Sequence, residues 1–339
     1  MEVTNTIRRV LSGETLDAAA AEATFDRFMS GEATQAEMAA LLAALRMRGE
    51  TAAEVAGGVR ALQKAMIPLA LDDDRIIDTC GTGGGTLTTF NISTAAAIVA
   101  AAGGVRIAKH GNRSFTSKCG SADVLEILGV PIELPPEDEK RMFGATGFVF
   151  MFAPAHHPAM RHVGPVRAAL GVTTIMNLLG PLANPAGVRR QVVGVAHPDL
   201  QRLVADALLE LGHERALVVH GEPGMDELSP LGPTRVFRIE NGALSEFEVA
   251  PSDFGWPEYA PSDLAGGEPE ENAERVRRVI DGREAGAARA AVLLNAAAAF
   301  WAAGAVDTLA AGVAAAEQSI DSGAAESQLQ SLQSFQPTP

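Results

Sequence analysis

The stretch GTGGGTLTTFNIST (residues 81–94, the glycine loop) places four glycines and six serine or threonine residues directly before an alanine-rich segment. A strand, a glycine-rich turn and a helix N-terminus form an anion site, because backbone N–H groups and the helix dipole converge there. The stretch has neither the lysine of a P-loop nor the third glycine of a dinucleotide-binding motif. A tight turn without a ligand is the alternative interpretation.

A second polar stretch is KHGNRSFTSK (residues 109–118, the basic loop). It brings Lys109, His110, Arg113 and Lys118 together in a chain whose formal net charge is −15. Loops that follow adjacent strands of an α/β sheet form a ligand crevice in many folds. We therefore expect the glycine loop and the basic loop to hold the phosphates of one ligand. A solvated surface loop is the alternative.

The third stretch, HGEPGMDELSP (residues 220–230, the carboxylate loop), carries Asp226 and Glu227 side by side. Mg²⁺ is typically held by one or two carboxylates together with substrate phosphates. The loop is therefore a candidate Mg²⁺ site, with an acidic solvent loop as the alternative.

A basic segment, HHPAMRHVGPVRAALG (residues 156–171), contains Arg161 and Arg167, and an arginine here could bind a carboxylate through two hydrogen bonds. Its His157 and His162 are five residues apart and no HExxH motif is present, so zinc is disfavoured. An ordinary surface helix is the alternative. The chain has no G-x-S-x-G motif, and covalent catalysis is not supported.

The elements that must position these stretches fall into two groups. Residues 1–66 have helical periodicity, with capping-box patterns at Thr34–Glu37 and Thr51–Glu54. From residue 72 onward, short apolar strands alternate with helices, which predicts a mostly parallel sheet. Asn241-Gly242 predicts a hairpin turn, and the apolar residues 287–304 predict a buried helix.

We therefore predict an α/β fold with a small all-helical N-terminal domain and a larger domain around a mostly parallel sheet. The helical domain covers residues 1–70, and residues 160–188 return to it. The α/β domain covers 71–159 and 189–330. Residues 331–339 are left as a polar tail, and the polar stretch SQLQSLQSFQPTP (327–339) is expected to fray.

Composition excludes several classes of function. The chain has 339 residues, and its net charge of −15 argues against a nucleic-acid partner, because phosphate contacts need a basic face. Two cysteines, Cys80 and Cys119, give no disulfide framework. We find no secretory signal and no apolar run long enough to span a membrane, and we expect a cytoplasmic protein without membrane contacts.

Five motifs occur in the order and spacing of one family: GTGG…FNIST, KHGNRS…SK.GSAD, HPAM..V.PVR..LG, NLLGPLANP and DELSP. On these motifs the chain resembles the anthranilate phosphoribosyltransferases from about residue 5 to residue 330. The resemblance implies a fold like that of the class II nucleoside phosphorylases. It also implies transfer of a phosphoribosyl group from 5-phosphoribosyl pyrophosphate (PRPP) to anthranilate, two Mg²⁺ ions per subunit and a homodimer.

The resemblance also implies roles for individual residues. The residues matching its PRPP site are Gly81, Thr82, Gly83, Gly84, Gly85, Thr89, Asn91, Ile92, Ser93, Thr94, Lys109, His110, Gly111, Asn112, Arg113, Ser114, Phe115, Thr116, Ser117 and Ser121. Those matching its anthranilate site are Gly81, Asn112, Arg167, His110 and His157. Mg²⁺ would be held by Ser93, Asp226 and Glu227. No residue is assigned as a general base.

The chain departs from the family pattern at two places. Gly85 stands where the family usually has an acid, and GVTTIMN has Thr173 and Met176 where the family often shows GVRTIFN. Two other functions stay open. One is a pyrimidine-nucleoside phosphorylase of the same fold, and the other is a non-catalytic relative that binds a nucleotide.

Overall fold

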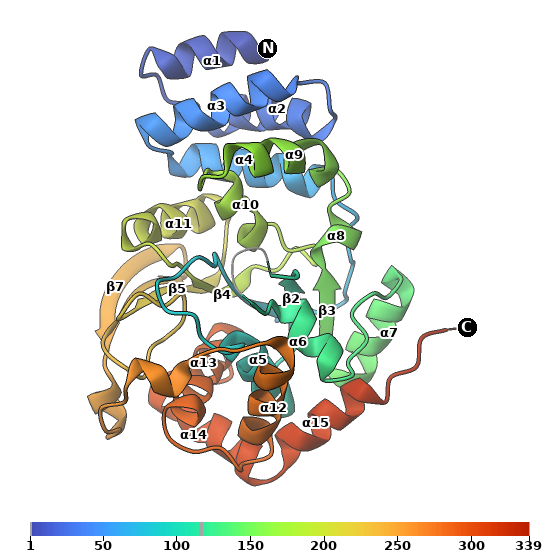
Figure 1. Cartoon of the computed structure of the whole chain (residues 1–339), viewed down its shortest axis with the longest axis vertical. Helices are drawn as coiled ribbons and strands as arrows, with labels where there is room; N and C mark the ends of the chain where they lie inside the picture. Colours follow the sequence, from blue (N-terminus) through green and yellow to red (C-terminus); the bar gives the residue numbers. More distant parts are fainter. Residues whose placement is uncertain (1, 115–117, 339) are drawn as a thin grey trace.

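A computed structural model describes residues 2–114 and 118–338, which form a helical unit next to a larger unit built around a sheet (Figure 1). The helical unit begins with α1 (Val3–Leu11), α2 (Ala18–Met29), α3 (Gln35–Arg48) and α4 (Ala52–Lys64). Both predicted capping boxes are present, at Thr34–Glu37 and Thr51–Glu54. These caps satisfy backbone groups that the first helical turn leaves free.

A later part of the chain packs against the helical unit. It contains α8 (Ala153–His156), α9 (Met160–Leu170) and α10 (Met176–Leu182). Helix α9 contacts α2 and α3, and α10 contacts α4. Val163 and Leu179 share one buried apolar cluster with Phe25 and Leu45. The helix that carries Arg167 therefore lies with the helical unit.

The larger unit is a seven-stranded sheet in the order β3-β2-β1-β4-β5-β6-β7. Its strands are β1 (Ile77–Gly81), β2 (Ile107–Gly111), β3 (Phe148–Phe152), β4 (Arg190–Gly194), β5 (Arg215–Gly221), β6 (Thr234–Glu240) and β7 (Ala243–Val249). The first five strands of that order are parallel to one another, and the pairs β5–β6 and β6–β7 are antiparallel. The predicted fold class is confirmed.

The hairpin between β6 and β7 turns at Asn241 and Gly242, as predicted. Both residues have positive φ, 54° and 73°. A two-residue turn of this kind matches the right-handed twist of the strands, and asparagine and glycine adopt it at low cost.

Helices cover both faces of the sheet (Figure 1). Helix α11 (Pro198–Glu210) lies on the face toward the helical unit. The other helices of the larger unit are α5 (Ile92–Ala102), α6 (Ser121–Ile127), α7 (Pro136–Thr146), α12 (Pro269–Ile280), α13 (Ala287–Ala303), α14 (Leu309–Asp321) and α15 (Ala324–Gln333). Two short 3₁₀ helices span Pro251–Phe254 and Pro261–Leu264.

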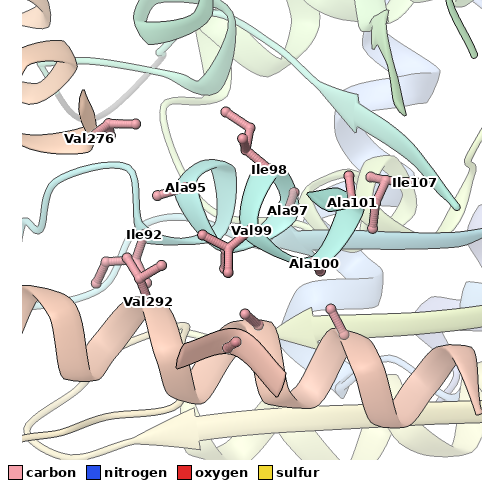
Figure 2. Packing of buried hydrophobic residues seen from close by; sticks show 14 of the residues in the cluster. Ile92, Ala95, Ala97, Ile98, Val99, Ala100, Ala101, Ile107, Val276 and Val292 are labelled. Atoms are coloured by element: carbon pink, nitrogen blue, oxygen red, sulfur yellow. The ribbon is translucent and has the colours of Figure 1, made fainter. Parts of the chain in front are cut away.

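Helices α5 and α13 form the centre of the core on the second face. Both consist mainly of alanine, so their backbones approach closely, and Figure 2 shows Val292 of α13 beside Ile92 of α5. The predicted buried helix is α13, whose side chains are buried along almost its whole length. Because α5 is fixed in this way, its N-terminus is held rigidly at the edge of the sheet.

The prediction that the polar stretch 327–339 frays is wrong for its first part, residues 327–333. Helix α15 continues to Gln333, and Leu329 and Leu332 are buried because their spacing places both on one helical face. Beyond the helix, Thr338 donates hydrogen bonds to Asp138 from its N–H, at 3.0 Å, and its hydroxyl, at 2.7 Å. Among the described residues, no helix is long and apolar enough to cross a membrane.

Candidate active site

The three polar loops meet at one edge of the sheet. Strands β1, β2 and β5 run in the same direction, so the loops that follow them lie together at their carboxyl ends. Between the loops lies a cavity of about 600 Å³.

Most of the predicted site residues line this cavity. They are Gly81, Thr82, Gly83, Gly84, Gly85, Thr89, Asn91, Ile92, Ser93, Thr94, Lys109, His110, Gly111, Asn112, Arg113, Ser114, Ser121, Asp226 and Glu227. The predicted residues Phe115, Thr116 and Ser117 lie outside the described residues. His157 and Arg167 are not part of the cavity wall. Six further residues line the cavity although the resemblance gave them no role. Four lie inside the quoted motifs and loops, Leu87, Thr88, Phe90 and Gly120, and the other two are Cys80 and Cys119.

Asp226 explains why the wall must contain glycine. Its Oδ2 accepts a hydrogen bond of 2.8 Å from the N–H of Gly83. A Cβ atom at Gly81 would overlap the Asp226 carboxylate, and one at Gly194, the neighbour of Gly81 on β4, would overlap the Asp226 backbone. Gly194 is a site residue that the sequence motifs did not indicate. Gly81 and Gly194 therefore make room for the protein's own carboxylate loop.

The glycine loop is also joined to the carboxylate loop at residues 85 and 86. A Cβ atom at Gly85 would lie 2.8 Å from the carbonyl oxygen of Gly224. Thr86 donates from its N–H to that carbonyl, at 3.2 Å, and from its hydroxyl to the carbonyl of Pro223, at 3.0 Å. At Gly85 the family's usual acid would crowd the carboxylate loop in its present position.

The N-terminus of α5 faces the same carboxylates. The N–H of Ser93 donates to Glu227 Oε1 at 3.2 Å. Lys109 on β2 is 2% exposed, and its Nζ donates to the carbonyl of Thr79 and lies 3.4 Å from Ser93 Oγ. One buried cation, one helix N-terminus and two carboxylates therefore share a small volume.

The electrostatics of the pair Asp226 and Glu227 favour a bound cation. Burial raises the pKa of the Asp226 carboxyl, and the Gly83 N–H offsets only part of the rise. Burial and then the neighbouring Asp226 charge raise the pKa of Glu227, against the opposing effect of Lys109. A divalent cation would relieve this repulsion.

The donor set fits Mg²⁺. Ser93, Asp226 and Glu227 offer only oxygen atoms, which this ion prefers. Within residues 2–114 and 118–338, no group of three or more His, Cys, Asp or Glu side chains could hold a metal. An ion held by two carboxylates would thus complete its coordination with water or substrate oxygens, as Mg²⁺ commonly does.

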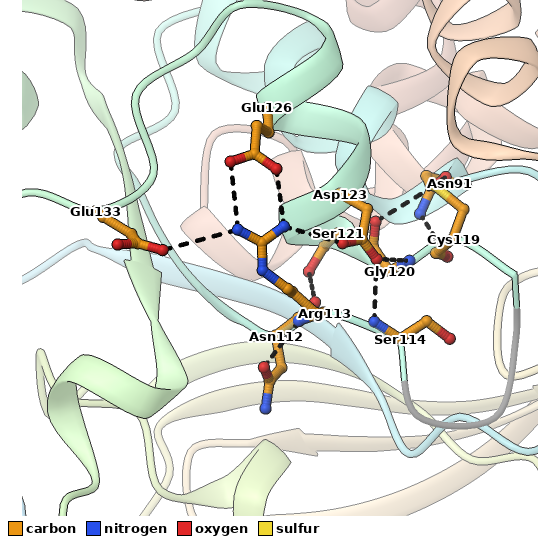
Figure 3. A network of polar contacts seen from close by, with 10 residues as sticks. All are labelled: Asn91, Asn112, Arg113, Ser114, Cys119, Gly120, Ser121, Asp123, Glu126 and Glu133. Carbon is orange, nitrogen blue, oxygen red and sulfur yellow. Dashed lines mark hydrogen bonds and ion pairs between the residues drawn. The ribbon is translucent and has the colours of Figure 1, made fainter.

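The charge of the basic loop differs from the expectation. Arg113 makes two hydrogen bonds to Glu126, at 2.8 and 3.2 Å, and one to Asp123 at 3.2 Å (Figure 3). Lys118 pairs with Glu268 at 2.8 Å. The expected local excess of positive charge is balanced at these two positions by acids from α6 and from the residue before α12.

Two histidines pack together at the cavity wall, where His110 lines the cavity and His157 lies behind it. The rings of His110 and His157 are 5.0 Å apart between centroids. Burial, and after it the charge of neighbouring histidines, lowers the pKa of His110 well below its usual value and that of His157 to about 4. Both rings are therefore neutral near pH 7.

His156 has a separate, structural role. It bonds to Glu139 at 2.9 Å and to the carbonyl of Ile67 at 2.8 Å. These bonds tie α7 and the end of the helical unit to the segment after β3.

Arg167 lies in the last turn of α9, and burial alone lowers its pKa. Within the described chain no carboxylate is paired with it. A partly buried guanidinium without an acid beside it is suited to an anionic ligand.

Comparison with known proteins agrees with this geometry. Residues 4–66 match the helical bundle domain and residues 73–326 the a/b domain of a glycosyl transferase family. The anthranilate phosphoribosyltransferase of Rubrobacter xylanophilus is 50% identical over 319 residues, which is 94% of this chain and 93% of that protein.

Two solved structures are also similar. The crystal structure of the Thermus thermophilus anthranilate phosphoribosyltransferase is 44% identical, has a TM-score of 0.92 and covers 99% of both chains. The Saccharomyces cerevisiae enzyme in complex with PRPP and Mg is 29% identical, with a TM-score of 0.90 over 97% of this chain and 96% of that one. The chain therefore belongs to the anthranilate phosphoribosyltransferases, a family of pentosyltransferase enzymes.

Proposed function

We propose that the chain transfers the 5-phosphoribosyl group of PRPP to anthranilate, giving N-(5-phosphoribosyl)anthranilate and pyrophosphate. This is the second step of tryptophan biosynthesis from chorismate. The observation that carries the proposal is the cavity in which an anion-binding glycine loop meets the half-buried carboxylate pair Asp226 and Glu227. The complex of the similar yeast enzyme with PRPP and Mg supports it.

The PRPP end of the reaction would lie between the glycine loop and the basic loop. Ser93, Asp226 and Glu227 would hold Mg²⁺, which when bound neutralises charge on the pyrophosphate that leaves. The N–H groups at the start of α5 and the Lys109 ammonium lie next to each other, and both would stabilise negative charge on the pyrophosphate. We expect two ions per subunit, a number that titration calorimetry would measure.

The anthranilate end would lie toward α9. Arg167 would bind the substrate carboxylate, and His110 and His157 would border the path of the aromatic ring. His110 Nε2 is buried without a hydrogen-bond partner among the described residues, so a polar group of a ligand would satisfy it. The amine of anthranilate is neutral at pH 7 and needs positioning more than deprotonation. We therefore assign no general base.

The fluorescence of anthranilate provides the test. With PRPP and Mg²⁺ present, we expect the signal to fall as anthranilate is consumed, and to fall far more slowly after the metal is chelated. A signal that stays constant under every metal condition would overturn the proposed function.

Replacement of Arg167 tests the anthranilate end. We expect Arg167→Ala to raise KM for anthranilate about 30-fold or more, because an ion pair in a partly buried site is worth about 2 kcal/mol or more. KM for PRPP should change less than about threefold, because only anthranilate presents a carboxylate. Equal increases in both constants would remove Arg167 from this role, and Arg161→Ala, an exposed arginine of the same helix, is the matched control.

We also propose that the chain forms a homodimer, as the resemblance implies. Leu11 and Met47 are apolar side chains of the helical unit with exposures of 71% and 87%. Such exposed apolar groups are candidates for a subunit contact. Light scattering on the purified protein would give the mass in solution.

A further inference from the structure

Residues 112–114, the outgoing limb of the basic loop, pack closely against residues 118–121, the returning limb that leads into α6 (Figure 3). Gly120 lies so close to the outgoing limb that a Cβ atom would be 2.6 Å from the carbonyl carbon of Arg113 and 2.7 Å from the carbonyl oxygen of Asn112. That same oxygen accepts hydrogen bonds from the N–H of Ala122, at 3.2 Å, and from Ser121 Oγ, at 3.3 Å. Close packing and hydrogen bonds therefore hold the two limbs together.

One carboxylate joins the limbs where they pack together. Asp123 Oδ2 accepts hydrogen bonds from the N–H of Ser114 on the outgoing limb, at 3.1 Å, and from the N–H of Gly120 on the returning limb, at 2.8 Å. Its Oδ1 accepts from Arg113 at 3.2 Å (Figure 3). Asp123 stands at the third position of α6, so the helix fixes where its carboxylate lies.

Charge makes this arrangement specific for an aspartate. Three donors, one of them a guanidinium, surround a carboxylate that is 18% exposed. Hydrogen bonds to an ionised acceptor are stronger than those to a neutral one. An asparagine could still accept from the two N–H groups, but its NH₂ would then face Arg113, donor against donor.

The joined limbs form part of the cavity. Asn112, Ser114 and Ser121 line the cavity. Each of them is, or is next to, a residue that donates a hydrogen bond to Asp123. Asp123 itself is not in the cavity wall, so it would act through the residues that it holds. It belongs to the GSAD motif, whose first part supplies Ser121 and whose aspartate had no role.

We propose that Asp123 is a positioning residue for PRPP: its carboxylate sets the spacing of the two limbs of the basic loop and so the placement of the groups that bind this substrate. The proposal rests on the proposed function, since PRPP is the ligand that those groups would meet.

The test compares Asp123→Asn and Asp123→Ala with the matched control Glu126→Gln. Glu126 also pairs with Arg113 but is 54% exposed, and it makes no hydrogen bond to the described part of the loop backbone. We expect Asp123→Ala to raise KM for PRPP about tenfold or more, equivalent to about 1.4 kcal/mol. Asp123→Asn should have a smaller effect in the same direction, and the control should stay within about twofold. KM for anthranilate should rise less than KM for PRPP, because of the residues next to Asp123 only Asn112 also matches the anthranilate site. A general loss of folding would instead lower kcat and leave both KM values unchanged.

Hydrogen exchange of the free protein provides a second readout. Exchange at the N–H groups of Ser114 and Gly120 should be faster in both Asp123 variants than in the wild type, with unchanged exchange in α13. If these rates and KM for PRPP match the wild type, the positioning role is overturned. If the wild type itself neither binds nor consumes PRPP, the proposed function fails instead, whatever the exchange rates show. Should Asp123→Ala not fold, Asp123→Asn keeps the test decisive, because its shape is nearly that of aspartate.

Discussion

The glycine loop and the basic loop both follow a parallel strand and line the same cavity, but different interactions hold them. Around Asp226 the glycine loop is fixed by shape, since Gly81 and Gly194 leave no room for a side chain. The basic loop is fixed by charged side chains, of which Asp123 is 18% and Arg113 42% exposed. Steric contacts tolerate no added atom, whereas exposed ion pairs contribute about 0–1 kcal/mol each. The glycine loop and the carboxylate loop should therefore be sensitive to added volume. In the basic loop most charges should matter little, and the exception is Asp123, which also accepts hydrogen bonds from two backbone N–H groups.

The largest effect should come from adding one methyl group beside Asp226, where the site is fixed by close packing. Gly194→Ala would place a Cβ atom into the Asp226 backbone, which cannot rotate away. We expect kcat/KM to fall about 100-fold, because displacing catalytic groups by about 1 Å costs that much. The free energy of unfolding, measured in urea, should fall by about 3 kcal/mol, as for overpacked cores.

Gly144→Ala is the matched control for this substitution. Gly144 lies within α7, and a Cβ atom there would meet nothing within 4 Å. Alanine in a helix interior is more favourable than glycine by about 0.5–1 kcal/mol. The control should therefore be neutral or slightly stabilising. Equal behaviour of the two variants would show that the contact with Asp226 does not constrain the site.

A smaller effect is expected at Gly85, where volume and charge can be separated. Gly85→Asp adds both a side chain against the Gly224 carbonyl and a third carboxylate near Asp226. Gly85→Asn adds nearly the same volume without the charge. We expect both variants to lose about 1–2 kcal/mol of stability. Only Gly85→Asp should shift the Mg²⁺ concentration that gives half-maximal activity, by about fivefold, since a nearby unit charge is worth about 1 kcal/mol even in water.

The measurement for position 85 is activity against Mg²⁺ concentration at saturating PRPP, with thermal unfolding in chelator as the second readout. Identical Mg²⁺ profiles for glycine, asparagine and aspartate would mean that this position does not sense the ion. The departure from the family pattern would then concern only loop packing.

The contrast between the loops also explains what the sequence could predict. The capping boxes at Thr34 and Thr51 and the Asn241-Gly242 turn depend on residues next to each other, so local physics predicts them. The three loops meet at one edge because alternating strands and helices imply a parallel sheet. Gly194 could not be found this way. Its importance depends on its register beside Gly81 and on the carboxylate loop that covers both.

Contacts between distant segments account for the remaining differences. Arg113 and Lys118 are basic in sequence, but Glu126 and Glu268 balance them only after folding. The polar stretch 327–339 has two leucines on one helical face, Leu329 and Leu332, and their burial allows its first part to form the end of α15. In each case the deciding partner is far away along the chain, and composition alone does not identify it.

The smallest effect should come from the second ion pair of the basic loop. Lys118 pairs with Glu268, but both side chains are well exposed, at 64% and 58%. An exposed pair of this kind contributes little, so Lys118→Gln should change KM for PRPP less than about twofold and leave the free energy of unfolding within about 0.5 kcal/mol. Its matched control is Glu268→Gln, which breaks the same pair from the other side. If Lys118→Gln alone raises KM for PRPP about tenfold, then Lys118 meets the ligand directly. In that case the basic loop would bind the ligand through the Lys118 charge, in addition to the hydrogen bonds by which Asp123 joins its two limbs.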